Sequence, residues 1–248
     1  MKYTEEELKE YNIYKYQEGS GFLSNLATFN PYVTVSKFIF KNFFNDNEKI
    51  IKGVKLNKRE RMMALFSNHV YESPNNRKNK YNGYELNNKI NNNTECVYHN
   101  MKKKEVLFCI RGTSVTSLKD FINDLGITQG TQRSEKRYKD TYQLLRQIKN
   151  MYQGFNIVVL GHSLGANLTS YMFEKDKSLE IYMFNAGSGP HDNIQKRLYE
   201  DSKKNRSKYR KVHEYHIKND LISAIPMYYG RKVFEISAVN KHSMINFL

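Results

Sequence analysis

A serine between two glycines is the residue of this chain best suited to chemistry. Ser163 is the centre of the pentapeptide G-H-S-L-G and follows the apolar run 155–160. Such a run is typical of a strand buried on both faces, and residues 164–175 have the pattern of a helix. A sharp strand–turn–helix exposes the serine Oγ, and glycines at its two flanks allow close packing. We therefore interpret Ser163 as a nucleophile flanked by Gly161 and Gly165, the alternative being a tight turn with an incidental serine.

A serine nucleophile needs a histidine base and a carboxylate that orients this base. On a turn of this kind the acid follows the serine in the chain and the base follows the acid. Asp220 comes a short turn after the predicted strand 212–217, and His242 lies in a loop beyond every plausible acid, so we expect these two residues to complete a triad. The alternatives are Asp192 and Asp201 for the acid, and His191, His213 and His216 for the base.

Strand and helix patterns alternate along the chain. Asn57 and Glu60 have the spacing of a capping box for a helix that runs to about Tyr71. Further helices are expected at 134–152 and 164–175, and strands at 84–90, 96–99, 106–111, 155–161, 179–184 and 212–217. This alternation predicts an α/β domain with a mostly parallel central sheet flanked by helices. If residues 100–105 turn a hairpin, Cys96 and Cys109 face each other across it.

Several motifs together resemble the class 3, fungal-type lipases of the α/β-hydrolase superfamily. The strand that ends in F-C-I-R-G-T at residues 108–113 is similar to the F-x-x-R-G-T of that family, and G-H-S-L-G is similar to its nucleophile turn. The pair Asp124-Leu125 and the acid turn from Asp220 to Pro226 complete the resemblance. It covers residues 57–248, which implies an α/β-hydrolase domain there and an N-terminal extension, residues 1–56, packing on its core.

The resemblance implies site residues and an activity. Ser163, Asp220 and His242 are the implied triad, and the backbone N–H groups of Thr113 and Leu164 form the implied oxyanion hole, assisted by the Thr113 hydroxyl. The implied reaction is hydrolysis of acylglycerol or phospholipid esters through an acyl-enzyme, without a cofactor or metal. The acid and base are 22 residues apart, closer in the chain than is usual for the family.

A short amphipathic helix is expected directly after the implied oxyanion residue. Ser117 and Asp120 have capping-box spacing, and Gly126 is a natural helix end. The apolar side chains of this helix recur at helical spacing; they are Leu118, Phe121, Ile122 and Leu125. The stripe either packs permanently on the core or belongs to a lid that presents it to a lipid surface.

Composition limits the remaining functions. The 248 residues are enough for one good-sized domain, and 39% hydrophobic residues exclude a wholly disordered chain. A net charge of +15 favours an anionic contact such as an acidic membrane, although coding bias and solubility explain it equally well. No zinc-finger, RRM or helix-turn-helix signature predicts specific nucleic-acid binding. Two cysteines, no signal peptide and no apolar run of membrane-spanning length indicate an intracellular or virion-associated protein.

Alternatives to a lipase remain open at this point. The same triad serves small-ester, thioester and other acyl hydrolases and acyltransferases, because a fold does not determine a substrate. A non-catalytic binding protein on the same fold is a further alternative, and the intact serine, aspartate and histidine set argues against it. The sequence does not determine the oligomeric state.

Overall fold

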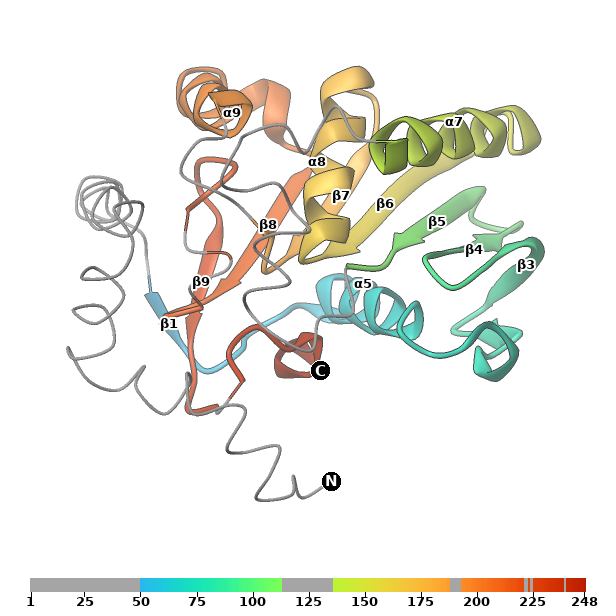
Figure 1. Ribbon diagram of the computed structural model, residues 1–248, viewed down its shortest axis with the longest axis horizontal. Helices are drawn as coiled ribbons and strands as arrows, with labels where there is room; N and C mark the ends of the chain where they lie inside the picture. The colour runs from blue at the N-terminus through green and yellow to red at the C-terminus, as the bar shows by residue number, and fades with distance from the viewer. Residues whose placement is uncertain (1–49, 113–135, 188–192, 221–222, 224, 239) are drawn as a thin grey trace.

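A computed structural model describes residues 50–112, 136–187, 193–220, 223, 225–238 and 240–248 (Figure 1). The described residues form one sheet with helices on both faces. The sheet has nine strands in the order β1-β9-β8-β7-β6-β5-β4-β3-β2. These strands are β1 (Ile50–Lys52), β2 (Lys80–Tyr81), β3 (Tyr84–Asn91), β4 (Glu95–Asn100), β5 (Glu105–Ile110), β6 (Asn156–His162), β7 (Glu180–Phe184), β8 (Val212–Ile217) and β9 (Lys232–Glu235).

The sheet is parallel from β1 across to β5 and antiparallel from β5 outward to β2. This mixed, mostly parallel arrangement with covering helices is an α/β-hydrolase fold, as the sequence predicts. Because β5, β6, β8 and β9 are parallel, their carboxyl ends lie along the same edge of the sheet. The loops that follow these four strands contain the predicted oxyanion residue, nucleophile, acid and base.

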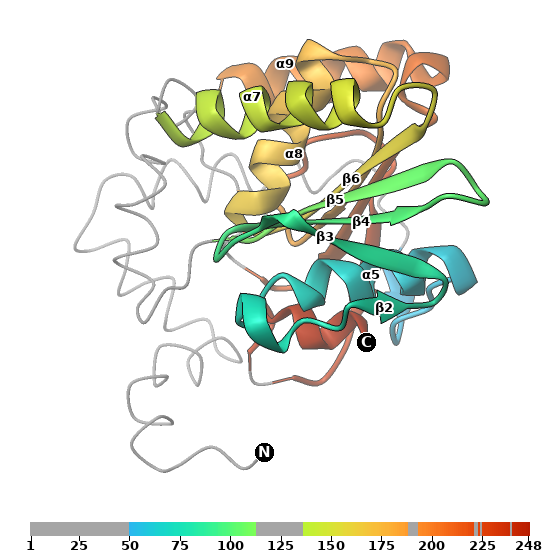
Figure 2. The ribbon, with the colours of Figure 1, turned by 90° about the vertical axis from the view of Figure 1, so that its right-hand side faces the viewer.

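Helices cover the sheet in two layers (Figure 2). One face carries α7 (Lys136–Met151), α8 (Leu164–Lys175) and α9 (Asn193–Lys204), and the other carries α5 (Lys58–His69) and the C-terminal 3-10 helix η5 (Met244–Phe247). Two further 3-10 turns are η2 (Pro74–Asn76) and η4 (Arg206–Tyr209).

The alternation of side chains along β5 divides the core between these layers. Val106 and Phe108 point into the cluster shared with α7 and α8, whereas Leu107 and Cys109 point into the cluster shared with α5. All four are fully buried. A central strand that packs on both faces needs apolar residues at successive positions, which explains the continuous apolar runs of β5 and β6.

Most predicted elements are confirmed. α5 has the predicted capping box between Asn57 and Glu60, and α8 has the predicted bounds. Cys96 and Cys109 are directly opposed across the hairpin, both as free thiols. Residues 50–56 contribute β1 to the sheet and Leu56 to the core, so the sheet begins before residue 57.

Candidate active site

The chain turns sharply at Ser163, between the end of β6 and the start of α8. The main chain there has φ 58° and ψ −125°, a conformation that L residues rarely adopt. A Cβ at Gly161 would lie 2.3 Å from the carbonyl oxygen of Gly165, and a Cβ at Gly165 would lie 2.2 Å from that of Ile110. Glycine is therefore required at both positions, because a side chain would collide with the main chain of the helix or of β5.

The end of β5 packs directly against the nucleophile turn. A Cβ at Gly112 would lie 2.8 Å from the Cβ of Ser163 and 2.7 Å from the carbonyl oxygen of His162. Ser163 itself is 2% exposed, and its Oγ has no hydrogen-bond partner among the described residues. Gly112 therefore lies beside the serine, while the next residue, Thr113, lies outside the described residues.

Asp220 and His242 form a buried pair. Asp220 follows β8, His242 follows β9, and the Nδ1 of the histidine lies 2.7 Å from Oδ2 of the aspartate. Their residues are 3% and 9% exposed. Burial alone would raise the pKa of Asp220, but the charge and hydrogen bond of His242 outweigh it and lower that pKa. The ring of His242 lies 4.9 Å, centroid to centroid, from that of His162, the neighbour of Ser163 in the chain.

A second hydroxyl supports the acid. Ser223 Oγ donates to Oδ2 of Asp220, and the same hydroxyl lies 2.9 Å from Nδ1 of His216. Because the carboxylate only accepts, the serine oxygen is left to accept from His216. The pKa of His216 is lowered well below its ordinary value by burial and by the charge of Arg231. Ser223 was not among the predicted site residues, although it lies only three residues after the acid.

The alternative acids and bases are elsewhere. His213 is at the opposite end of β8, where its Nε2 lies 3.8 Å from Oε1 of Glu180, and His216 reaches Asp220 only through Ser223. Asp201 accepts hydrogen bonds within α9 and η4. His191 and Asp192 lie outside the described residues. Among the described candidates, His242 alone contacts the predicted acid directly.

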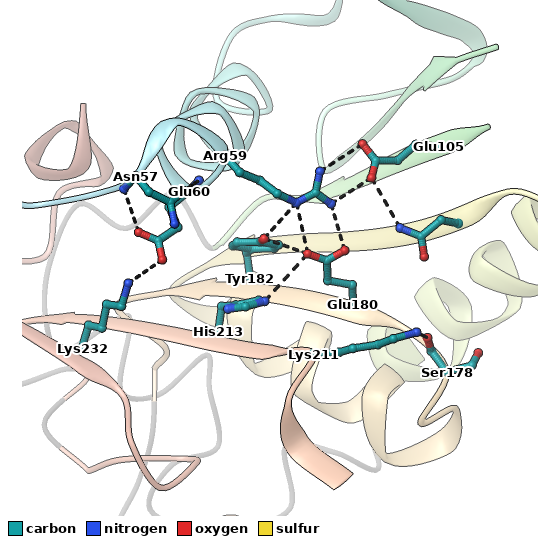
Figure 3. Close-up of polar contacts among 11 residues, drawn as sticks. Asn57, Arg59, Glu60, Glu105, Ser178, Glu180, Tyr182, Lys211, His213 and Lys232 are labelled. Carbon is teal, nitrogen blue, oxygen red and sulfur yellow. Dashed lines mark hydrogen bonds and ion pairs between the residues drawn. The ribbon is translucent and has the colours of Figure 1, made fainter. Parts of the chain in front are cut away.

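The amino ends of the strands carry a different set of polar residues, at the edge opposite Ser163. Arg59 of α5 lies between Glu105 of β5 and Glu180 of β7, 2.8 Å from each carboxylate (Figure 3). Tyr182 and His213 complete this Arg59 cluster around Glu180. The cluster ties α5 to the starts of two strands and takes no part in the geometry around Ser163.

Several predictions fall on residues whose structure is not described. They are the oxyanion residue Thr113 and the helix residues Leu118, Phe121, Ile122 and Leu125. Within the part of the chain that is described, no group of three or more His, Cys, Asp or Glu residues is arranged to hold a metal ion. In the same part, no helix has the length and apolar character needed to cross a membrane.

The family of the chain follows from a match to a family model described as "Phospholipase-like: Tle-like phospholipase domain", which covers residues 62–242. The chain belongs to this Tle-like phospholipase family. The matched segment includes Ser163, Asp220 and His242. Membership confirms the predicted kinship with lipases of the α/β-hydrolase superfamily and makes the chain an ester hydrolase of the lipase type.

Solved structures similar to the chain are lipases. The Lip2 lipase of Yarrowia lipolytica is 16% identical, with a TM-score of 0.47, and the match covers 74% of this chain and 83% of the lipase. A lipase from Rhizopus microsporus var. chinensis is 15% identical, with a TM-score of 0.43 and coverage of 70% and 71%. No curated protein sequence matches the chain significantly.

Proposed function

We propose that this chain is a serine esterase that hydrolyses phospholipid or acylglycerol esters through a triad of Ser163, Asp220 and His242. The observation that carries the proposal is the buried contact between Asp220 and His242, at the same sheet edge as the Ser163 turn. The three residues follow parallel strands, so the loops that contain them lie along one edge of the sheet, which supports the proposal. The intact set favours catalysis over a binding protein that retained only the fold.

The hydrogen bond to Asp220 determines the tautomer of the base. A carboxylate only accepts, so Nδ1 of His242 carries the proton at the 2.7 Å contact and the lone pair is on Nε2. Nε2 takes the proton of Ser163 as Oγ attacks the ester carbonyl. His242 then gives that proton to the leaving alcohol, and a water repeats both transfers to release the acid from the acyl-enzyme.

The negative oxygen of the tetrahedral intermediate needs donors beside Ser163. The N–H of Leu164 belongs to the first turn of α8, where helix N–H groups have no partner within the helix. The contact of Gly112 with Ser163 supports Thr113 as the second donor, since its N–H is on the next peptide of the chain. Two such donors are worth several kcal/mol to the transition state, at ~2.7–4 kcal/mol each.

The family supports a lipid ester as substrate, with a phospholipid as the first choice. A fluorophosphonate probe tests the serine: wild type is expected to react at Ser163, and Ser163→Ala is expected not to react. A panel of vesicular phospholipid, emulsified triacylglycerol and soluble p-nitrophenyl esters then tests the substrate class. Activity confined to the soluble esters would replace the lipase assignment by a small-ester hydrolase, and a wild type that neither reacts nor hydrolyses would end the proposal.

A further inference from the structure

One tyrosine hydroxyl lies where three parts of the site meet. Tyr71 follows the last turn of α5, and its oxygen lies 3.1 Å from the backbone nitrogen of Gly112 and 2.7 Å from Nδ1 of His162. Gly112 precedes the proposed oxyanion residue, and His162 precedes the proposed nucleophile. The other ring nitrogen of His162, Nε2, lies 2.6 Å from the carbonyl oxygen of His242.

The direction of each hydrogen bond follows from its partners. A carbonyl only accepts, so Nε2 of His162 carries a proton and donates to His242. Burial, and next the charge of His242, lower the pKa of His162 to about 3, so its ring is neutral and Nδ1 accepts. The Tyr71 hydroxyl therefore donates to Nδ1, and its oxygen accepts the N–H of Gly112. All donors and acceptors in this chain of three hydrogen bonds are matched.

The surroundings hold Tyr71 in this position. The guanidinium carbon of Arg111 lies 5.2 Å from the centre of the tyrosine ring, and the ring of His162 meets it edge-on at 5.7 Å. A Cβ at Gly112 would lie 2.9 Å from the hydroxyl oxygen, so the glycine allows the hydroxyl to come this close. Burial raises the pKa of Tyr71 to about 12, which keeps the hydroxyl protonated as a donor.

These three hydrogen bonds connect two loops that follow strands far apart in the sheet. Gly112 follows β5 and His242 follows β9, and three strands, β6, β7 and β8, separate β5 from β9 in the sheet. β5 and β9 are therefore not paired with each other. The hydrogen bonds through Tyr71 and His162 connect the two loops, and they pass directly beside the nucleophile turn.

We propose that Tyr71 and His162 are positioning residues, which hold the oxyanion strand end and the loop of the base at fixed places on either side of Ser163. The inference rests on the proposed function. Neither residue is expected to touch the substrate. Loss of their hydrogen bonds should therefore lower kcat and leave KM close to the wild-type value, because a displaced donor or base weakens only the transition state.

Tyr71→Phe is the first test, because it removes the hydroxyl and keeps the ring. The N–H of Gly112 and Nδ1 of His162 both lose a partner, and we expect kcat to fall ~10–100-fold, the range seen when supporting hydrogen bonds around a site are removed. Tyr209→Phe is the matched control: it removes the hydroxyl of another buried tyrosine, which is bonded to the side chain of Asp201 in α9. Its kcat should equal that of wild type.

Two substitutions at His162 separate its hydrogen bond with His242 from its hydrogen bond with Tyr71. In His162→Gln the amide nitrogen takes the place of Nε2, so the donor to His242 is kept and the acceptor for Tyr71 is lost. In His162→Asn the amide oxygen of the shorter side chain takes the place of Nδ1, so the acceptor is kept and the donor is lost. Each is expected to lower kcat. In His162→Gln the bond between Tyr71 and His162 is already broken, so adding Tyr71→Phe should lower kcat further only through the lost acceptor for the Gly112 N–H.

The outcomes distinguish this inference from the proposed function. The readouts are kcat and KM on a soluble ester, the rate of fluorophosphonate labelling, and the imidazole ¹⁵N shifts, which should report an Nε2–H tautomer for His162. Wild-type kcat and labelling in a folded Tyr71→Phe would overturn the inference and leave the function intact. Misfolding could also reduce kcat, but it would at the same time lower the melting temperature and the fraction of protein that the probe labels. The proposal instead expects that all of the protein is labelled, at a reduced rate. An unreactive wild type would overturn the function itself.

Discussion

Nδ1 of His242 lies 2.7 Å from Oδ2 of Asp220, although 22 residues and strand β9 separate the two in the chain. The pair forms because β8 and β9 are parallel neighbours whose carboxyl ends lie at the same edge. Its geometry has direct consequences for activity.

The three triad residues are expected to act as a unit. Ser163→Ala, Asp220→Asn and His242→Ala should each lower kcat by roughly 10⁴-fold, and a double variant should lose little more than either single one. Steady-state kinetics on a soluble ester measures this. His213→Gln is the matched control at the far edge of the sheet. If it abolished turnover while His242→Ala did not, the base would be misassigned.

Ser223→Ala tests the second hydrogen bond to the acid. The pKa of Asp220 is lowered in the folded protein, so this carboxylate contributes stability above its unfolded pKa that is lost as pH falls through the folded one. Ser223 is one of the groups that lower this pKa. The variant should therefore lose stability at a higher pH than wild type, measured by urea unfolding between about pH 2 and pH 6.

Activity should move in the same direction. Without the Ser223 hydroxyl, the Asp220 carboxylate loses its charge at a higher pH, so the acidic limb of kcat/KM should shift to higher pH. Ser67→Ala is the control, since the buried Ser67 hydroxyl has no hydrogen-bond partner among the described residues. An unshifted limb in Ser223→Ala would mean that Ser223 does not influence the triad.

Arg59→Met should affect stability without affecting catalysis. The change leaves Glu105 and Glu180 without their shared cation. Burial would raise the pKa of each carboxyl, but the contacts with Arg59 outweigh it and lower both. The free energy of unfolding should fall by about 1–2 kcal/mol, less than the ~3–5 kcal/mol for a fully buried pair, because the Arg59 side chain is 37% exposed.

Chemical denaturation at pH 7 measures that loss, and kcat should stay at the wild-type value. Lys80→Met removes a salt bridge to Glu85 in which both side chains are exposed, and no measurable loss is expected there. Equal stability of the two variants would show that the Arg59 cluster is no stronger than a surface pair.

The cysteine pair should be reduced and slow to react. Cys96 and Cys109 are opposed across the hairpin and both are fully buried. Burial, and next a hydrogen bond with Cys96, raise the pKa of Cys109 well above its ordinary value, so the reactive thiolate is rare. A thiol reagent at pH 8 should label neither residue rapidly in the native protein, and two thiols should react after unfolding without reductant. A count of zero would indicate a disulfide.

The predicted helix around Phe121 offers a test of interfacial activity. If its apolar stripe meets a lipid surface, Phe121→Ser should reduce activity on emulsions and leave activity on a soluble ester unchanged. The charge of +15 should then favour anionic vesicles, with binding that weakens as salt rises. Unchanged emulsion activity and salt-independent binding would identify the stripe as ordinary core.

The sequence predicted those elements whose pattern is contained within one short segment of the chain. The apolar runs of β5 and β6 and the cap of α5 are local, and so is the G-H-S-L-G turn. The edge strand β1 and its neighbour β9 were not predicted, because three or four residues carry too little periodicity and their pairing is decided by tertiary contacts. The many charged residues of α9 mask its apolar positions, so its helical pattern is weak in the sequence.

The residues of the site also differ in how much local signal they carry in the sequence. Ser163 stands in a motif, and Asp220 and His242 follow from chain order. Tyr71 lies at the end of an amphipathic helix, where its spacing is that of a core residue and carries no sign of its contacts. Its role depends on how α5 packs beside the ends of β5 and β6, which no local pattern encodes. Ser223 had a usable signal, since a hydroxyl three residues after an aspartate can turn back to it.

The backbone at Ser163 has a φ of 58°, which costs a residue with a side chain about 1–3 kcal/mol. Only the native state bears this cost, and glycine would escape most of it. Selection for a more stable protein and selection for hydrolysis therefore oppose each other at this one position. In descendants that no longer needed the reaction, replacement of this serine by glycine would be favoured by folding itself, so its persistence in a sequence is a sign of continuing use.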